Sequence, residues 1–338
     1  MDEQIVIFKN EKTGDLIHSV SSIKEIISKN QNTKINIFLS HYNSEMKFLF
    51  TYHNVIFHII AEKIDLKDKI KILIFFFKNK IKETYIFKPS FFLYLLPLFF
   101  KFKVIKFYGI CVNNNNYYRP PLILRNLLER FVVNDRGTKK IRKSINDLHL
   151  NLVLNEDKSN YNLSTLDKKS LFNENVKNYI FIHFNKFKFN KLEWDLNHFF
   201  KIVDELNVVN KNIVITNDLN DEKTNKLIQN KYSELSSKGI YYYPNAKGEF
   251  FFNLIGNAKL IVAFHGMITS IGAIQKVKVL DLFNCDIKNK DDYYRYKNAF
   301  HEFKPKLGNY EFLIPKKDFN HTIRKIKKLI VNGRKINS

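Results

Sequence analysis

The sequence predicts an α/β protein with two domains in series, each built on a parallel sheet. The chain has 338 residues, which is longer than a typical single domain. Short runs of β-branched and aromatic residues alternate with segments of helical periodicity in both halves. A polar stretch without this alternation separates the two halves.

The first domain is placed at residues 1–112, where the alternation has the spacing of a Rossmann-like unit. The expected strands are 5–9, 35–39, 55–60, 84–87 and 104–108. The expected helices are 16–29, 44–51, 66–79 and 90–100. The helix at 90–100 is the most apolar segment but is too short to cross a bilayer, so we expect a buried or interfacial helix.

Residues 113–175 are expected to form a linker with connecting helices at 122–131 and 139–148, because an Asn run and the pair Pro120 and Pro121 interrupt the alternation. The second Rossmann-like domain is placed at residues 176–318. Its expected strands are 179–184, 212–216, 240–243, 260–264 and 277–283. Its expected helices are 196–206, 222–235, 249–256 and 268–275.

Residues 319–338 are expected to form a basic helix and a tail, since apolar residues alternate there with Lys and Arg. Two interpretations stay open for this helix. It caps the fold as a solvated basic helix, or it lies on an anionic membrane face.

The formal net charge of +23 would ordinarily suggest nucleic acid or an anionic surface as partner. Lys, Asn, Ile and Phe are over-used together, however, as an AT-rich coding sequence would cause, and the aromatic residues fall inside the expected strands and helices. We therefore expect no nucleic-acid partner. The chain has only two cysteines, Cys111 and Cys285, and its N-terminus lacks a signal-peptide layout, so we expect a cytoplasmic protein, with peripheral membrane contact left open.

The loop after the first expected strand, residues 10–15 (NEKTGD), is one candidate site. Ligands of open α/β sheets bind beyond the carboxyl ends of strands, and Thr13, Gly14 and Asp15 lie at such an end. Asp15 is either the N-cap of the following helix or a carboxylate of the site.

The loop at 264–269 (FHGMIT) is the second candidate site. Gly266 at a strand-to-helix turn leaves the amides of Met267, Ile268 and Thr269 available to an anion such as a diphosphate. His265 is either a hydrogen-bonded turn residue or a ligand contact that adds a hydrogen bond or a charge.

Weaker signals lie after the neighbouring strands. Lys186, Lys188 and Lys191 follow the strand that ends near His183, and each could supply a cation to a phosphate. The loop at 216–221, with Thr216 and Asn217, could face a nucleotide. No acidic cluster has the pattern of a metal site, so we expect no obligatory metal and no cofactor.

Three stretches together resemble glycosyltransferase family 9, which includes the lipopolysaccharide heptosyltransferases. The opening IVIFKNEKTGDLIHSVSSIKEI is similar to the family's first strand, Gly-Asp turn and helix, and the stretch YIFIHFNKFKFNKLEWDLNHFFKIVDEL is similar to its strand, basic loop and Trp. The stretch LIGNAKLIVAFHGMITSIGAIQKVKVLDLF is similar to its nucleotide-sugar loop. Phe264 and His265 depart from the family's Asp and hydroxyl residue, and Thr269 or Ser270 stands where a His is expected.

The resemblance implies a GT-B architecture, with two Rossmann-like domains whose parallel sheets face each other across a cleft. It implies metal-independent transfer of a hexosyl or heptosyl group from a nucleoside diphosphate sugar to a glycan or glycolipid acceptor of the lipopolysaccharide type. Asp15 then takes the place of the catalytic base and Trp194 that of the family's Trp. Lys191 is nearest to the expected phosphate-binding Lys, with Lys188 and Lys186 still open, and Arg119 and Arg136 could contact acceptor phosphates.

Two other functional classes compete with this interpretation. A catalytically silent GT-B binding protein would account for the altered loop at 264–269. A basic nucleic-acid-binding protein would account for the charge, and a steep salt dependence of binding would reveal it.

Overall fold

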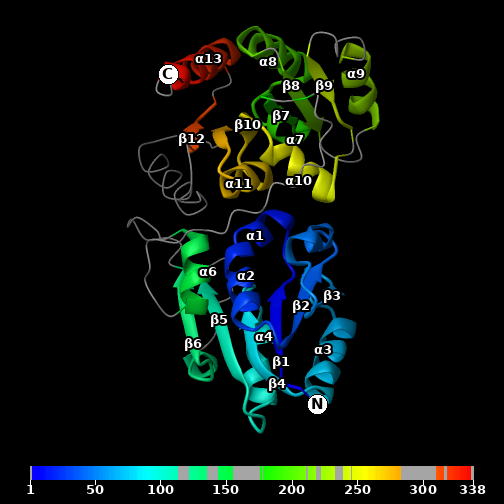
Figure 1. The fold of residues 1–338 in the computed structure, drawn as a ribbon, viewed down its shortest axis with the longest axis vertical. Helices are drawn as coiled ribbons and strands as arrows, with labels where there is room; N and C mark the ends of the chain where they lie inside the picture. The colour runs from blue at the N-terminus through cyan, green and yellow to red at the C-terminus, as the bar shows by residue number, and fades with distance from the viewer. Residues whose placement is uncertain are drawn as a thin grey trace. The chain divides into compact units, whose positions relative to one another are not determined.

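The computed structural model describes residues 2–112, 122–134, 144–154, 176, 178–210, 212–217, 222–232, 239–244, 246–282, 310–315 and 318–335. These residues form two compact units, one containing the described residues up to 154 and the other containing those from 176 onward. Figure 1 shows both units with many of their helices and strands labelled.

The first unit contains a six-stranded sheet in the order β3-β2-β1-β4-β5-β6, and every neighbouring pair is parallel. Its strands are β1 (Gln4–Lys9), β2 (Lys34–Ser40), β3 (Val55–Ile60), β4 (Ile81–Ile86), β5 (Lys106–Val112) and β6 (Arg130–Asn134). This order is that of a dinucleotide-binding fold, in which the direction of winding reverses between β1 and β4. The expected Rossmann-like unit is therefore confirmed.

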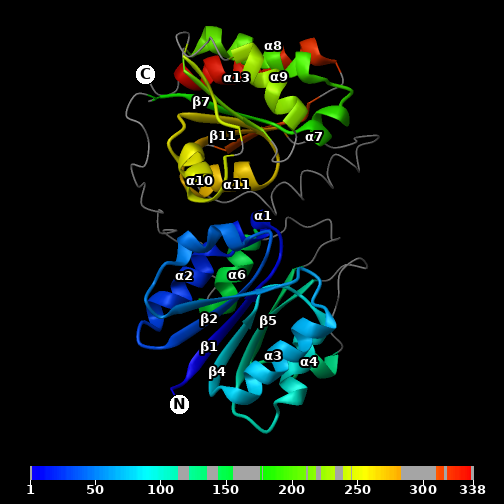
Figure 2. The same cartoon turned by 90° about the vertical axis from the view of Figure 1, so that its right-hand side faces the viewer.

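Helices cover both faces of this sheet, as Figure 2 shows for α2 and α6 on one side and α3 and α4 on the other. They are α1 (Thr13–Ile17), α2 (Val20–Lys29), the 3₁₀ helix η1 (Ser44–Phe50), α3 (Leu66–Lys78), α4 (Phe91–Phe99), α5 (Leu122–Arg125) and α6 (Ile145–Leu154). Alternate residues of β1 face opposite layers. Val6 and Phe8 accordingly join the core cluster that contains Ile72 and Phe76 of α3.

Three expected elements of the first unit need correction. The helix expected at 16–29 is divided, since α1 ends before His18 and α2 begins after Ser19. The helix expected at 44–51 has 3₁₀ geometry. The helix expected at 122–131 ends at Arg125, and the β-branched and aromatic run that follows forms β6, the edge strand next to β5. Of the helix expected at 139–148, residues 139–143 lie outside the described residues.

The second unit repeats the same winding. Its sheet has the order β12-β11-β10-β7-β8-β9, again parallel throughout. Its strands are β7 (Ile180–Phe184), β8 (Ile213–Asn217), β9 (Ile240–Tyr242), β10 (Leu260–Phe264), β11 (Lys278–Leu282) and β12 (Tyr310–Leu313). The winding reverses between β7 and β10, and β12 is a strand that the sequence analysis did not predict.

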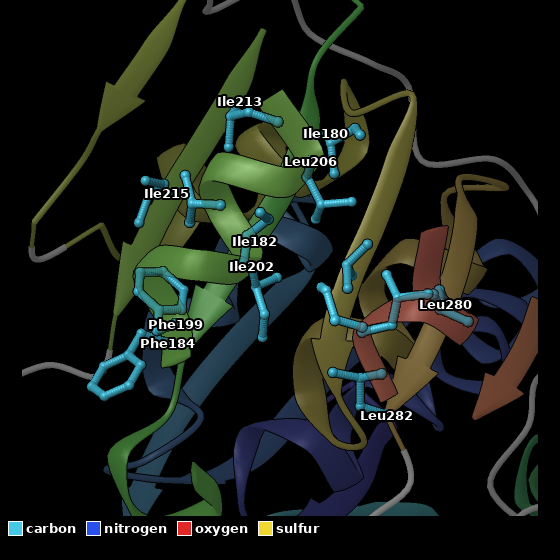
Figure 3. Packing of buried hydrophobic residues seen from close by; sticks show 14 of the residues in the cluster. Ile180, Ile182, Phe184, Phe199, Ile202, Leu206, Ile213, Ile215, Leu280 and Leu282 are labelled. Atoms are coloured by element: carbon cyan, nitrogen blue, oxygen red, sulfur yellow. The ribbon is translucent and has the colours of Figure 1, made fainter. Parts of the chain in front are cut away.

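The core of the second unit includes a layer of apolar side chains from the sheet, α8 and α13. Figure 3 labels those from the sheet and α8. The helices of this unit are α7 (Lys186–Asn190), α8 (Leu196–Val209), α9 (Glu222–Tyr232), α10 (Gly248–Gly256), α11 (Met267–Ile274) and α13 (Phe319–Lys335). Ile323, Ile326 and Ile330 of α13 are buried in this layer, and Lys327 pairs with Glu205 of α8 at 2.5 Å. The apolar side of the C-terminal helix is thus part of the core of this unit.

Trp194 is also buried in this layer and packs edge-on against Phe319 at 5.2 Å between ring centroids. It therefore ties the segment before α8 to α13. In the part of the chain that the structure describes, no helix combines the length and apolarity needed to cross a bilayer.

Candidate functional site

The predicted site residues follow strands at the two reversal points of the sheets. After β1, helix α1 carries Thr13, Gly14 and Asp15; after β7, helix α7 carries Lys188; and after β10, Gly266 precedes α11. In open α/β sheets, ligands bind beyond the carboxyl ends of the strands at such reversal points.

Gly266 is the N-cap of α11 and has a conformation that requires glycine. Its φ is 153°, and a Cβ there would lie 3.3 Å from Nζ of Lys188. The Thr269 hydroxyl closes the first turn, accepting from Gly266 N at 3.1 Å and donating to Gly266 O at 2.9 Å. Thr269 is fully buried, so its hydroxyl serves the helix start, while the first amides of α11 lack intrahelical acceptors.

Lys188 is the lysine that reaches this glycine turn. The side chain of Asn185 caps α7 by accepting from Lys188 N at 2.9 Å, and the Lys188 ammonium donates to the carbonyl of His265. Lys191 instead lies over the ring of Phe187, with Nζ 4.6 Å from the centroid, and Lys186 is exposed. The cation next to Gly266 is therefore Lys188, which comes three residues before the position favoured from the sequence.

His265 is paired with a buried acid. Its ring Nδ1 lies 2.7 Å from Oδ2 of Asp281, a residue of β11 with no exposed surface. His265 itself keeps 23% of its side chain exposed. Both interpretations from the sequence, a hydrogen-bonded turn residue and a residue accessible to a ligand, are compatible with this position.

Polar groups at the ends of β7 and β8 are also paired. His183 Nδ1 lies 2.9 Å from the Thr216 hydroxyl. The Tyr242 hydroxyl donates within 2.9 Å of both Asn217 Oδ1 and Asn225 Oδ1, and the amide of Asn217 also donates to Asn225. Thr216 and Asn217 are buried, so these groups hold the strand ends in place rather than extend into solvent.

In the first unit, Asp15 occupies the third position of α1. The N-cap is Lys12, which makes no side-chain capping bond, so the interpretation of Asp15 as an N-cap is wrong. Within the described part of the chain the half-buried Asp15 carboxylate makes no hydrogen bond. Thr13 is buried, and its hydroxyl donates to the carbonyl of Tyr42 at 2.7 Å. Gly14, between Thr13 and Asp15 in the sequence, is half-buried.

A charged cluster surrounds this helix start. Lys9, whose side chain is almost completely buried, pairs with Glu11, and the Lys88 ammonium donates to the carbonyl of Asn10 at 3.2 Å and to that of Glu62. Burial raises the pKa of Glu11, with Lys9 opposing the shift and Asp15 adding to it. Burial also lowers the pKa of Lys88. The chain thus places two cations and two acids at the carboxyl ends of β1 and β4.

Several of these residues escaped the sequence analysis. Asp281 is a lone acid within an apolar strand, which is itself a signal of a buried partner. Lys88 follows a strand that was expected to end at 87, and its neighbours in space are distant in sequence. Asn225 and Tyr242 carry no signal that separates them from other polar residues.

Of the other expected contributors, Arg119, Arg136 and residues 218–221 lie outside the described residues, as does Cys285, for which no role in the site is expected. Cys111 is described and buried. Among the described residues, no group of three or more His, Cys, Asp or Glu side chains has an arrangement that could hold a metal ion.

No protein-family model matches the chain, and no curated protein matches it. Solved structures are similar over almost its whole length. ADP-heptose lps heptosyltransferase II of E. coli matches with a TM-score of 0.62 at 13% identity, covering 98% of this chain and 99% of that one.

A glycosyl transferase family 9 structure from Veillonella parvula has a TM-score of 0.60 at 12% identity, covering 97% of this chain and 89% of that one. The E. coli heptosyltransferase WaaC with ADP has a TM-score of 0.61 at 10% identity and covers 98% of both chains. At these identities the likeness concerns the fold. The chain has the α/β fold with two Rossmann-like domains that is seen in glycosyltransferase family 9 structures.

Proposed function

We propose that this chain transfers a glycosyl group from a nucleoside diphosphate sugar to an acceptor hydroxyl. The observation that carries the proposal is the position of the Lys188 ammonium beside Gly266 at the start of α11. A cation next to helix N-terminal amides is suited to a diphosphate, which carries negative charge on several oxygens. The shared fold with heptosyltransferase structures supports the same assignment.

In the proposed reaction, the bond between the anomeric carbon and the diphosphate oxygen breaks as the acceptor oxygen bonds to that carbon. The electron pair leaves with the diphosphate, and Lys188 with the amides of Met267 and Ile268 stabilises the growing negative charge. The acceptor hydroxyl loses its proton to the Asp15 carboxylate, which acts as the general base. No metal ion enters these steps.

The assignment of domains follows from these roles. We place the acceptor side in the first unit, which adds β6 and α6 to residues 1–112, and the nucleotide-sugar side in the second unit, which adds α13 to residues 176–318. His183, Thr216 and Asn217 then shape the nucleotide side by holding the ends of β7 and β8, and His265 lies where it could contact the diphosphate.

The finer assignment rests on the same relatives. The donor then carries a hexosyl or heptosyl group, and the acceptor is a glycan or glycolipid of the lipopolysaccharide type. The reaction takes place in the cytoplasm. These assignments suit a chain that shares the fold of lipopolysaccharide heptosyltransferases. Peripheral contact with the inner membrane would bring the protein to a lipid-linked acceptor.

The test is a thermal-shift screen of the full chain against ADP, GDP, UDP and CMP and their sugars, followed by measurement of nucleotide release from any sugar that binds. A ligand that binds only the folded state must raise the apparent stability by mass action. Stabilisation by one nucleotide family together with nucleotide release from its sugar supports the proposal. No stabilisation at millimolar concentration contradicts it.

A silent binding protein is the second candidate function. Phe264 and His265 stand where the resemblance leads to an Asp and a hydroxyl residue, and His265 is held by Asp281. Such a protein would bind the nucleotide sugar but neither transfer nor hydrolyse it. Binding without nucleotide release, in the presence of a range of acceptors, would favour this candidate.

A further inference from the structure

Helix α3 presents a continuous apolar stripe to solvent. Leu66, Ile70, Ile74 and Phe77 are exposed by 72%, 49%, 46% and 60%. Their spacing of four, four and three residues places them on one side of the helix. The opposite side is anchored in the core by Ile72 and Phe76, so the stripe is additional to the face that packs on the sheet.

Neighbouring elements extend this stripe. Figure 2 shows α3 and α4 beside each other on one side of the first sheet, and the Lys69 ammonium lies 5.9 Å from the ring centroid of Phe92 in α4. Phe77 stacks at 6.3 Å on Phe102, which is 68% exposed, in the turn that follows α4. Isolated exposed apolar residues are normal, whereas a contiguous group of them marks an interaction surface.

A row of lysines borders the stripe. Lys67, Lys71 and Lys78 are exposed, and their spacing of four and seven residues places them along one adjacent line of the helix. The acid within α3, Asp68, is buried and accepts from the amide of Ala61 at 2.7 Å. Oδ1 of Asp68 also lies 3.8 Å from the Lys71 ammonium, but no acidic side chain of α3 is exposed. The exposed part of α3 therefore combines apolar and cationic side chains.

This combination fits a lipid surface better than a protein partner. Lysine is depleted in protein–protein interfaces, where arginine is the favoured cation. Helices that lie in a membrane interface bury Leu and Phe among the acyl chains and hold Lys against anionic headgroups. We propose that the α3 face, defined as Leu66, Ile70, Ile74 and Phe77 with Lys67, Lys71 and Lys78, docks the protein on an anionic membrane surface.

The proposal deepens the membrane contact suggested above by naming its surface, but it stands independently of glycosyl transfer. The α3 face lies in the first unit, whereas Lys188 and Gly266 lie in the second. Vesicle binding and nucleotide binding can therefore fail separately.

The experiment is flotation of the full chain with phosphatidylglycerol–phosphatidylcholine vesicles, compared with phosphatidylcholine alone. We expect binding to the anionic vesicles, and a loss of roughly tenfold or more in the triple variant Lys67→Gln, Lys71→Gln, Lys78→Gln. We expect a similar loss when Leu66→Gln, Ile70→Gln and Ile74→Gln are combined. If this apolar variant fails to fold by circular dichroism, Leu66→Gln alone, at the most exposed position, should still weaken binding.

Matched controls come from α9 in the second unit. The variant Lys223→Gln, Lys226→Gln, Lys231→Gln removes the same charge, and Leu227→Gln removes an apolar side chain that is 48% exposed. Both should bind vesicles like the wild type and keep any nucleotide-induced thermal shift. Equal losses in the α9 controls would overturn the proposal, because binding would then follow net charge alone. A wild type that ignores vesicles but forms dimers sensitive to Ile70→Gln would overturn it in favour of self-association.

Discussion

His265 and Asp281 join the start of α11 to β11 through a hydrogen bond of 2.7 Å between ring Nδ1 and Oδ2. Asp281 is fully buried and belongs to the strand next to β10. This hydrogen bond to the carboxyl group of Asp281 fixes the orientation of the imidazole ring. The turn that contains Gly266 is therefore anchored from the sheet interior.

Replacing His265 should destabilise the second unit. His265→Ala leaves the buried carboxylate of Asp281 without this donor, which should cost about 1–3 kcal/mol. The control is His183→Ala, which removes a bond to the neutral Thr216 hydroxyl and should cost only about 0.5–1.5 kcal/mol. Urea unfolding followed by the fluorescence of Trp194, the chain's single tryptophan, reports on this unit. Equal losses in the two variants would contradict a special role for the Asp281 pair.

Lys188 rather than Lys191 should carry nucleotide binding. Lys188→Gln removes the ammonium beside Gly266 and with it the proposed charged hydrogen bond to the diphosphate. Such a bond contributes about 1.5–3 kcal/mol, so the nucleotide should bind roughly 10- to 100-fold more weakly. Lys191→Gln, which removes the cation over the Phe187 ring, should leave the affinity unchanged. Isothermal titration calorimetry with the nucleotide found in the thermal-shift screen measures both. A larger effect at Lys191 would restore the assignment favoured from the sequence.

The strands could be predicted from the sequence, but the lysine that lies beside Gly266 could not. The strands of both sheets, except β6 and β12, were located from β-branched and aromatic runs, because burial selects such residues directly. Lys186, Lys188 and Lys191 have the same chemistry within six positions, and their directions depend on where α7 begins. The Asn185 cap, which sets that start, became visible only in three dimensions.

Contacts between segments that are distant in the sequence could not be predicted either. Asp281 meets His265 because β10 and β11 are neighbours, and Lys88 meets Asn10 because β1 and β4 are neighbours. Neither strand pairing follows from local periodicity. The glycine at 266 could be identified beforehand, since a strand-to-helix turn with several free amides favours glycine whatever the surroundings.

Gly266→Ala should abolish nucleotide binding with only a modest loss of stability. Alanine at position 266 would have to adopt a φ of 153°, and its methyl group would lie 3.3 Å from the Lys188 ammonium. The turn and the cation must therefore both shift. Gly248→Ala is the matched control, because Gly248 has a φ of 57° at the start of α10 in the same unit. It should lower the thermal midpoint through a strain of about 1 kcal/mol but keep the nucleotide-induced shift. Loss of the shift in both variants would point to general destabilisation.

Asp15→Asn should slow transfer by about 10²- to 10⁴-fold, which is the usual contribution of a general base, while nucleotide affinity stays the same. The substitution keeps the size of the side chain, and the Asp15 carboxylate makes no hydrogen bond within the described residues, so the fold should tolerate it. Asp65→Asn is the control, since Asp65 caps α3 by accepting from the amide of Asp68 at 2.8 Å. Its transfer rate should match the wild type. Rates are measured with the donor identified by the screen, and an unchanged rate in Asp15→Asn would remove Asp15 from the mechanism.

Acidification should destabilise the first unit through His149. This residue is buried against α1 and α2, with Nδ1 2.9 Å from the Ser19 hydroxyl and 3.1 Å from the carbonyl of His18. Burial lowers its pKa well below the ordinary value of 6.5, and the charge of Lys9 adds to the shift. The unfolded chain therefore takes up a proton near pH 6.5 that the folded chain refuses, so this stability is complete above pH 6.5 and declines as the pH falls toward the folded pKa.

The expected loss from this one group is about 1.4 kcal/mol between pH 7.5 and pH 5.5. His149→Asn keeps an amide donor for the carbonyl of His18 but does not titrate, so its stability should depend less steeply on pH over the same range. His58, whose pKa burial also lowers, remains in both proteins and contributes equally to each. Denaturant unfolding followed by circular dichroism at the two pH values gives the comparison. Parallel pH dependence in the wild type and His149→Asn would show that His149 protonation is not coupled to folding.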